Sequence, residues 1–114
     1  MFARLAAIIG FLGVVFGTMG AHVVEQLLEA NGRAETWDTA VLYHLLHAVV
    51  LFALSFRRET VPKGPWIALA LGILLFSGDL YVYSLTNIKI FGFMAMFGGI
   101  SFMVGWLWLV IKPR

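Results

Sequence analysis

The stretch from Trp37 to Leu51 reads Trp-Asp-Thr-Ala-Val-Leu-Tyr-His-Leu-Leu-His-Ala-Val-Val-Leu, an apolar run interrupted by two histidines. Residues three apart on a helix share a face, so His44 and His47 are predicted to point to the same side. Ionisable side chains inside an apolar span usually face other helices rather than lipid. The stretch therefore predicts a buried helix around which the remaining helices pack.

The composition of the chain indicates an integral membrane protein. Of its 114 residues, 61% are hydrophobic and 12% are charged, and the mean hydropathy is +0.94. A soluble domain carries about 25% charged residues. Cysteine is absent, which excludes disulfides and thiolate chemistry. The net charge of +2 is too small for a nucleic-acid footprint, so the lipid bilayer is the predicted partner and nucleic acid is not.

Four apolar segments predict an all-α fold, a four-helix transmembrane bundle that forms a single domain over residues 1–114. Four helices of ~20 residues leave room only for short connections. The predicted spans are residues 2–22, 38–56, 66–86 and 91–111. Residues 22–31 are predicted as a short amphipathic continuation that ends at Asn31-Gly32. Residues 57–65 contain prolines and charges and are predicted as a turn.

The basic residues predict the orientation of the spans. With four spans, the two termini and the connection at residues 57–65 share one side, which holds six of the eight Lys and Arg residues. The positive-inside rule then places both termini in the cytoplasm. Tryptophans favour the membrane interfaces, so Trp37 is expected at the outer interface and Trp66, Trp106 and Trp108 at the inner one.

Small residues recur in steps of three and four along the first and fourth spans. In lipid, such spacing lets another helix approach closely, and van der Waals contact then holds the pair. The predicted helix-packing residues are Gly10, Gly13, Gly17, Gly20, Gly98 and Gly105. The same seams make a homo-oligomer or a larger membrane complex a reasonable expectation.

Ionisable side chains form one candidate site in the outer half of the predicted bundle. Its members are His22, His44, His47 and Asp79, with Glu25, Tyr43 and Tyr81 as supporting groups. A carboxylate in hydrocarbon must be protonated or find a cationic or hydrogen-bonded partner. At the predicted depth of Asp79 the expected partner is His44.

Three interpretations of this cluster stay open. The side chains can form structural hydrogen bonds between helices. They can handle protons or a cation. They can also supply nitrogen and oxygen ligands to a metal or, through two histidines, to a haem, although no cofactor is expected. No phosphate loop, nucleophile elbow or zincin motif is present, so the chain is not expected to be an enzyme.

Four motifs, in order, resemble a known family. They are Gly17-Thr-Met-Gly-Ala-His22, Thr39–Tyr43 followed by His47-Ala48, Leu75-Phe-Ser-Gly-Asp-Leu-Tyr81, and Gly98-Gly-Ile-Ser-Phe102 followed by Gly105-Trp106. They resemble the YgdD/YwdK family of small four-span bacterial inner-membrane proteins, a domain of unknown function. The resemblance implies the four-span architecture and the inner, cytoplasmic membrane as the location. It implies no established activity.

The departures from the family pattern concern two members of the polar cluster. His22 and His47 match the pattern, whereas Asp79 stands where the family commonly has serine and His44 where a relative can have glutamine. The leading expectation is therefore a non-enzymatic accessory, assembly or oligomerising component. The alternatives are a proton- or cation-handling transporter or channel-like protein, and a metal- or cofactor-binding membrane subunit.

Overall fold

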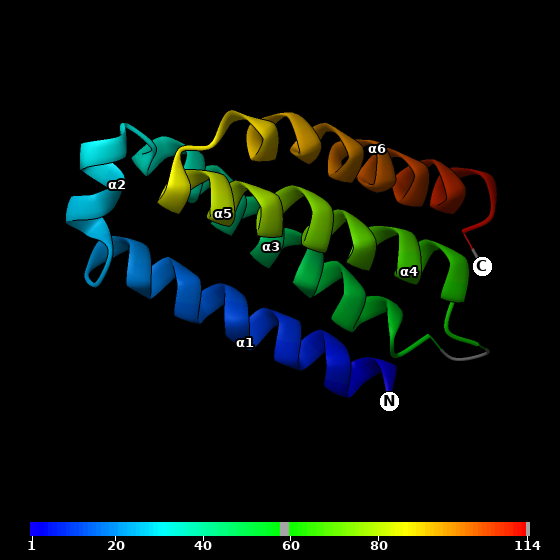
Figure 1. The fold of residues 1–114 in the computed structure, drawn as a ribbon. Helices are drawn as coiled ribbons and strands as arrows, with labels where there is room; N and C mark the ends of the chain where they lie inside the picture. Colours follow the sequence, from blue (N-terminus) through cyan, green and yellow to red (C-terminus); the bar gives the residue numbers. More distant parts are fainter. Residues whose placement is uncertain (58–59, 114) are drawn as a thin grey trace.

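The computed structural model describes residues 1–57 and 60–113, and this part of the chain is helical and contains no strand (Figure 1). The elements are α1 (Phe2–Ala21), α2 (Glu25–Asn31), α3 (Ala34–Leu54), α4 (Lys63–Gly72), the π-helical segment η1 (Ile73–Gly78), α5 (Asp79–Thr86) and α6 (Lys89–Ile111). The elements α4, η1 and α5 are continuous and are called the third span. Four helices, α1, α3, the third span and α6, are long and apolar enough to cross a membrane.

The helix boundaries differ from the predicted spans by a few residues. Helix α3 begins at Ala34 and not near residue 38. The third span begins at Lys63, inside the predicted turn, because Pro65 falls in the first helical turn, where no backbone N–H is needed. Two residues of that predicted turn, 58 and 59, lie outside the described residues. The chain breaks after α1 and restarts as α2, which ends at the left-handed Gly32 (φ 68°), as the Asn31-Gly32 pair predicts.

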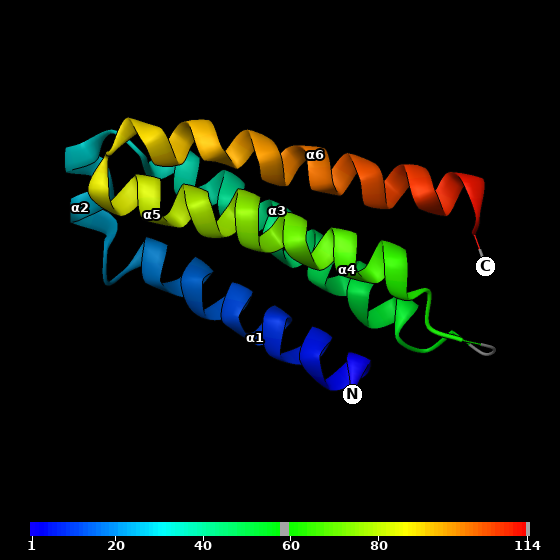
Figure 2. The ribbon, with the colours of Figure 1, turned by 45° about the vertical axis from the view of Figure 1, so that its right-hand side comes forward.

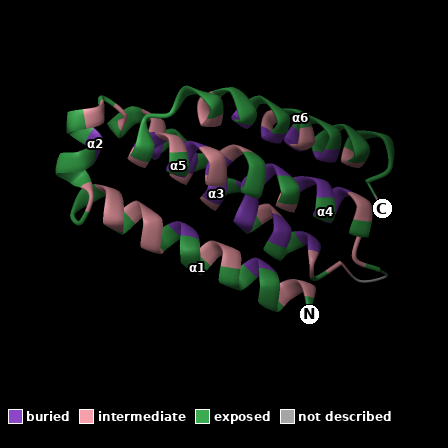
Figure 3. Cartoon of the chain, viewed as in Figure 1, coloured by how far each residue is buried: buried purple, intermediate pink, exposed green. Residues whose placement is uncertain are grey.

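The four spans form an open zigzag and not a closed bundle. In the described part of the chain, Cα atoms of α1 come within 8 Å of α2 and α3 only, and those of α6 only of the third span. Figures 1 and 2 show α1 and α6 at opposite edges, with α3 and the third span between them. Buried residues concentrate in these two middle helices (Figure 3). In each middle span, 39% of the residues in an apolar stretch of 18 residues are buried within the protein. The corresponding share is 11% in α1 and 22% in α6.

Glycines set the distance between neighbouring helices. On α1, a Cβ added to Gly13 would lie 2.6 Å from Leu45 Cδ2, whereas one added to Gly10 would make only an ordinary contact. Side chains of a neighbouring span also lie directly over Gly17, Gly20 and Gly105. Gly98 of α6 is different, because its added Cβ would lie 2.5 Å from the backbone carbon of Leu75 in η1. Helix α6 therefore rests on the main chain of the π segment.

Hydroxyl groups and indoles add hydrogen bonds between the spans. Ser77 donates to the Ala40 carbonyl at 2.7 Å, which ties η1 to α3. Two of the tryptophans expected at the membrane interfaces also join neighbouring helices. Trp37 and Trp66 are both buried, and their indole N–H groups donate to backbone carbonyls of Phe16 and Leu51.

Candidate functional site

His44 lies midway along α3 and connects three helices. Its Nε2 is 2.7 Å from the carbonyl oxygen of Ile9 on α1, and its Nδ1 is 2.8 Å from the hydroxyl of Tyr81 on α5. A carbonyl oxygen can only accept, so Nε2 carries the hydrogen and Nδ1 accepts the Tyr81 O–H. The neutral imidazole thus has both nitrogens paired and holds α1, α3 and α5 together.

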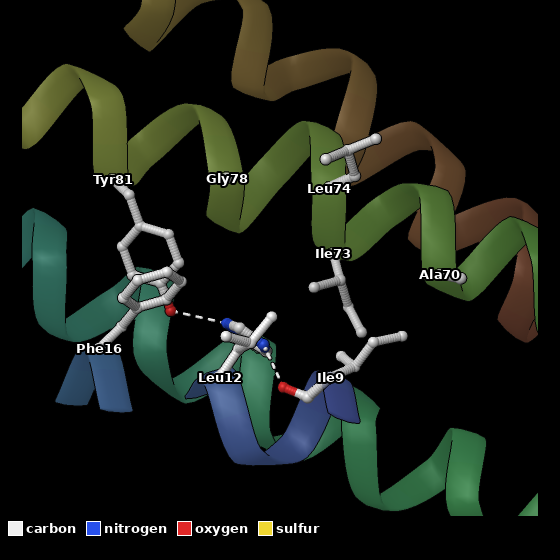
Figure 4. Close-up of a pocket in the computed structure, with 9 residues that line it drawn as sticks. Ile9, Leu12, Phe16, Ala70, Ile73, Leu74, Gly78 and Tyr81 are labelled. Atoms are coloured by element: carbon white, nitrogen blue, oxygen red, sulfur yellow. Dashed lines mark hydrogen bonds between the residues drawn. The ribbon is translucent and has the colours of Figure 1, made fainter. Parts of the chain in front are cut away.

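This histidine lines a groove between α1 and the third span, which we call the α1 groove. Figure 4 shows the groove and its labelled lining residues. The groove encloses about 290 Å³ and is lined by Ile9, Leu12, Phe16, His44, Ala70, Ile73, Leu74, Gly78 and Tyr81. The rings of Phe16 and Tyr81 pack 4.7 Å apart. The polar atoms of His44 and Tyr81 are bonded to each other, so the free surface of the groove is almost wholly apolar.

His47 bonds in a different direction, towards α6. Its Nδ1 donates to the Tyr43 carbonyl of its own helix at 2.8 Å, so its Nε2 is the acceptor for the Trp106 indole N–H at 3.0 Å. The imidazole also stacks on Phe102, with ring centroids 3.9 Å apart and planes inclined by 16°. The same-face arrangement predicted for His44 and His47 does not bring them to one site, because their bonds go to opposite edges of the zigzag.

A second groove lies beside His47 and is called the α6 groove. It encloses about 640 Å³ and is lined by Tyr43, His47, Phe76, Gly99, Phe102, Met103, Trp106, Leu107 and Val110. Aromatic rings form most of its wall, since Tyr43 packs 4.8 Å from Phe76 and Phe76 packs 5.7 Å from Phe102. His47 joins α3 to α6 across this groove.

The predicted contact between His44 and Asp79 is wrong. Both ring nitrogens of His44 bond to Tyr81 and Ile9, and Asp79 Oδ2 is buried without a hydrogen-bond partner in the described part of the chain. Ser77 donates to α3 and Tyr81 bonds His44 on the same helix, so these two residues, four apart, mark the face of the third span that meets α3. Asp79 lies two residues from each of them and therefore does not share that face.

The four predicted members of the cluster also lie at different depths. His22 ends α1 and is exposed, and its neighbour Glu25 is exposed on α2. His47 lies closer to Leu54 than to Ala34 along α3. Within residues 1–57 and 60–113, no three His, Asp or Glu residues are grouped to hold a metal ion.

Two participants in the actual arrangement were not expected from the sequence. Trp106 was assigned to the membrane interface but bonds His47, and Phe102, which stacks on His47, was not singled out. Both lie on the face of α6 that carries Gly98 and Gly105, so the small-residue seam was the signal that could have located them. The π segment leaves no comparable signal, although Ser77-Gly78 stands within it.

Comparisons with known proteins give the family of the chain. Residues 16–99 match the family model described as "Protein of unknown function (DUF423)". The chain belongs to the DUF423 family. It is 36% identical over 117 residues to the UPF0382 membrane protein YwdK of Bacillus subtilis, covering 97% of this chain and 94% of the relative. It is 34% identical over 110 residues to the UPF0382 inner membrane protein YgdD of Escherichia coli K12, covering 93% and 83%. No solved structure matches the chain.

The family assignment confirms the resemblance found in the motifs and the class of membrane protein. In this DUF423 chain, the motif that ends at Tyr81 supplies the end of η1 and the partner of His44. The motif that starts at Gly98 supplies the glycine on which η1 rests and the ring that stacks on His47. The motifs therefore coincide with the contacts that join the spans.

Proposed function

We propose that this DUF423 protein is a non-enzymatic transmembrane component that acts by packing against other membrane proteins or against a second copy. One observation carries the proposal. The ring nitrogens of His44 and His47, the two buried ionisable groups of α3, are all used in bonds within the chain. Such hydrogen bonds hold transmembrane helices together, and they leave these imidazoles without a free nitrogen for a metal or a haem.

The edge helices offer the surface for such a partner. Phe11 of α1 is 66% exposed, and Val104 of α6 is also exposed. The glycines of α1 are already occupied by side chains of α3, so a partner would meet large apolar side chains and not a glycine seam. Packing between such surfaces in lipid rests on van der Waals contact.

The same proposal includes a location and an orientation. The positive-inside rule supports cytoplasmic termini, because six of the eight basic residues belong to that side. The printed name of YgdD, an inner membrane protein, supports the bacterial inner membrane. Green fluorescent protein fused after the last residue should fluoresce, and alkaline phosphatase fused there should be inactive. The reverse pair of results would contradict the orientation.

Cysteine cross-linking tests the partner surface directly, because the native chain contains no cysteine. We expect Phe11→Cys on α1 or Val104→Cys on α6 to cross-link in native membranes to a second copy or to another protein. Leu71→Cys on the third span is the matched control, since it is exposed but lies on a middle helix. A protein that purifies as a strict monomer and cross-links from neither edge helix would overturn the proposal.

A proton- or cation-handling role is the second candidate, and Asp79 alone favours it. Its Oδ2 is buried in the third span without a partner in the described residues. Intramembrane carboxyl groups often mark ion pathways. If this role is correct, Asp79→Asn abolishes flux in proteoliposomes while the helical content is unchanged. A wild-type protein that passes neither protons nor cations under an imposed gradient would rule it out.

A further inference from the structure

The α6 groove has space that the packing of the helices does not need. A Cβ added to Gly99 would meet no atom within 4 Å, whereas the adjacent Gly98 is pressed against η1. The volume of about 640 Å³ lies within the ~300–1,000 Å³ of typical small-molecule sites. Such sites are mostly apolar and aromatic, with few polar groups that fix the ligand. The groove has this composition.

Tyr43 is the residue with a hydroxyl group among the side chains that line the α6 groove. Tyr43 lies near the middle of α3 and is 38% exposed, and its hydroxyl takes no part in the hydrogen bonds found among the described residues. The nitrogens of His47 and Trp106 are bonded to each other, and no charged side chain lines the groove. A hydroxyl left unpaired in hydrocarbon is costly, so a ligand with a neutral oxygen acceptor would be favoured.

We propose that the α6 groove binds the head ring of a quinone-class membrane lipid. A quinone carbonyl accepts the Tyr43 O–H, and the flat ring packs against the exposed rings of Tyr43 and Trp106. The apolar tail leaves towards the bilayer past Met103 and Leu107. An acyl chain would fill the same space but would leave the hydroxyl unpaired. The proposal concerns binding alone and holds whether or not the chain has a protein partner.

The α1 groove shows why the proposal is specific to the α6 groove. It is lined by Tyr81, but the hydroxyl of that residue already donates to His44. Its volume of about 290 Å³ is also at the lower limit for a ligand site. The α1 groove therefore lacks both the free donor and the room that the α6 groove has.

Tryptophan fluorescence of the purified full chain in lipid nanodiscs tests the site, with decylubiquinone as the probe. We expect saturable quenching, because Trp106 lines the groove. Tyr43→Phe removes the donor and should weaken binding about threefold to tenfold, the effect of one hydrogen bond. Gly99→Leu should abolish saturable binding by filling the groove. Tyr83→Phe, which removes a hydroxyl from another face, is the control and should bind as the wild type does.

Three results would overturn the proposal. The first is quenching that rises linearly with probe concentration, or that Gly99→Leu leaves unchanged, since the quinone then only partitions into the bilayer. The second is equal binding by Tyr43→Phe together with competition by palmitate, which would make an acyl chain the occupant. The third result applies if Gly99→Leu fails to fold. Met103→Trp at the exposed rim then fills the groove from the lipid side, and unchanged quinone binding by this variant would overturn the proposal.

Discussion

The α1 groove and the α6 groove each hold one histidine of α3, yet the two histidines secure the helices differently. His44 bonds to a backbone carbonyl of another helix and to Tyr81, which is only 7% exposed. His47 bonds to a carbonyl of its own helix and to Trp106, which is 43% exposed. Both histidines are 4% exposed. The first connects three helices, whereas the second connects α3 to α6 beside the larger groove. Equal residue types three positions apart therefore do not have equal roles.

The glycines repeat this contrast at the level of the main chain. Gly13 meets the flexible end of Leu45, which can move, whereas Gly98 meets the backbone of η1, which cannot. A side chain introduced at Gly98 must therefore separate two helices. The edge formed by α6 has a close backbone contact in addition to hydrogen bonds, whereas the edge formed by α1 is held by side chains and hydrogen bonds alone.

The largest effect is expected at Gly98. Gly98→Ala should lower the free energy of unfolding by about 3 kcal/mol, the upper end of the usual range for overpacking, and Gly13→Ala by about 1 kcal/mol. Gly99→Ala and Gly10→Ala are the matched controls and should be neutral or slightly stabilising, because alanine favours helix. Unfolding by dodecyl sulfate in mixed micelles, followed by circular dichroism, measures all four. Equal losses at Gly98 and Gly99 would refute the backbone contact.

The next effect is expected at His44. His44→Leu should cost about 2 kcal/mol, because it breaks two hydrogen bonds and leaves the buried Tyr81 hydroxyl unpaired. Tyr81→Phe in the same background should recover part of the loss, with a coupling energy of about 1 kcal/mol. The same unfolding assay on the two single variants and the double variant gives this value. Additive losses would show that the bond contributes nothing in the membrane.

A smaller effect is expected at His47. His47→Leu should cost about 1 kcal/mol, since its carbonyl partner lies on its own helix and Trp106 stays partly exposed to lipid. Its coupling to Trp106→Phe should be about 0.6 kcal/mol. If the loss at His47 exceeds the loss at His44 in parallel measurements, the assignment of His44 as the stronger connection is wrong.

The sequence predicted the spans well because their signal is local. About twenty apolar residues in a row identify a span whatever its neighbours are, and Asn31-Gly32 marks a helix end through its own backbone preference. The open zigzag could not be predicted from local signals. How α1 lies relative to the third span depends on contacts between distant side chains, such as the rings of Phe16 and Tyr81, which meet only after the spans have packed.

The candidate site was predicted less well, and the reason is helical phase. The residue types were identified, but the face of the third span that meets α3 was not. That face carries Ser77 and Tyr81, whereas Asp79 was expected there. An error in the assigned face changes every partner of a span, whereas it scarcely changes where the span begins or ends. Partners across helices are therefore harder to predict than spans.

The smallest effect is expected at Asp79, and it tests whether this carboxyl group contributes to the hydrogen bonds around His44. Asp79→Leu should raise the free energy of unfolding by about 0.5 kcal/mol, because it removes a buried oxygen that has no partner within the described residues. Combined with His44→Leu, the two changes should be additive to within about 0.5 kcal/mol. A destabilised Asp79→Leu protein with strong coupling to His44 would mean that the two side chains bond in the membrane. The α1 groove would then hold an ion pair, and its contrast with the α6 groove would be one of charge as well as of packing.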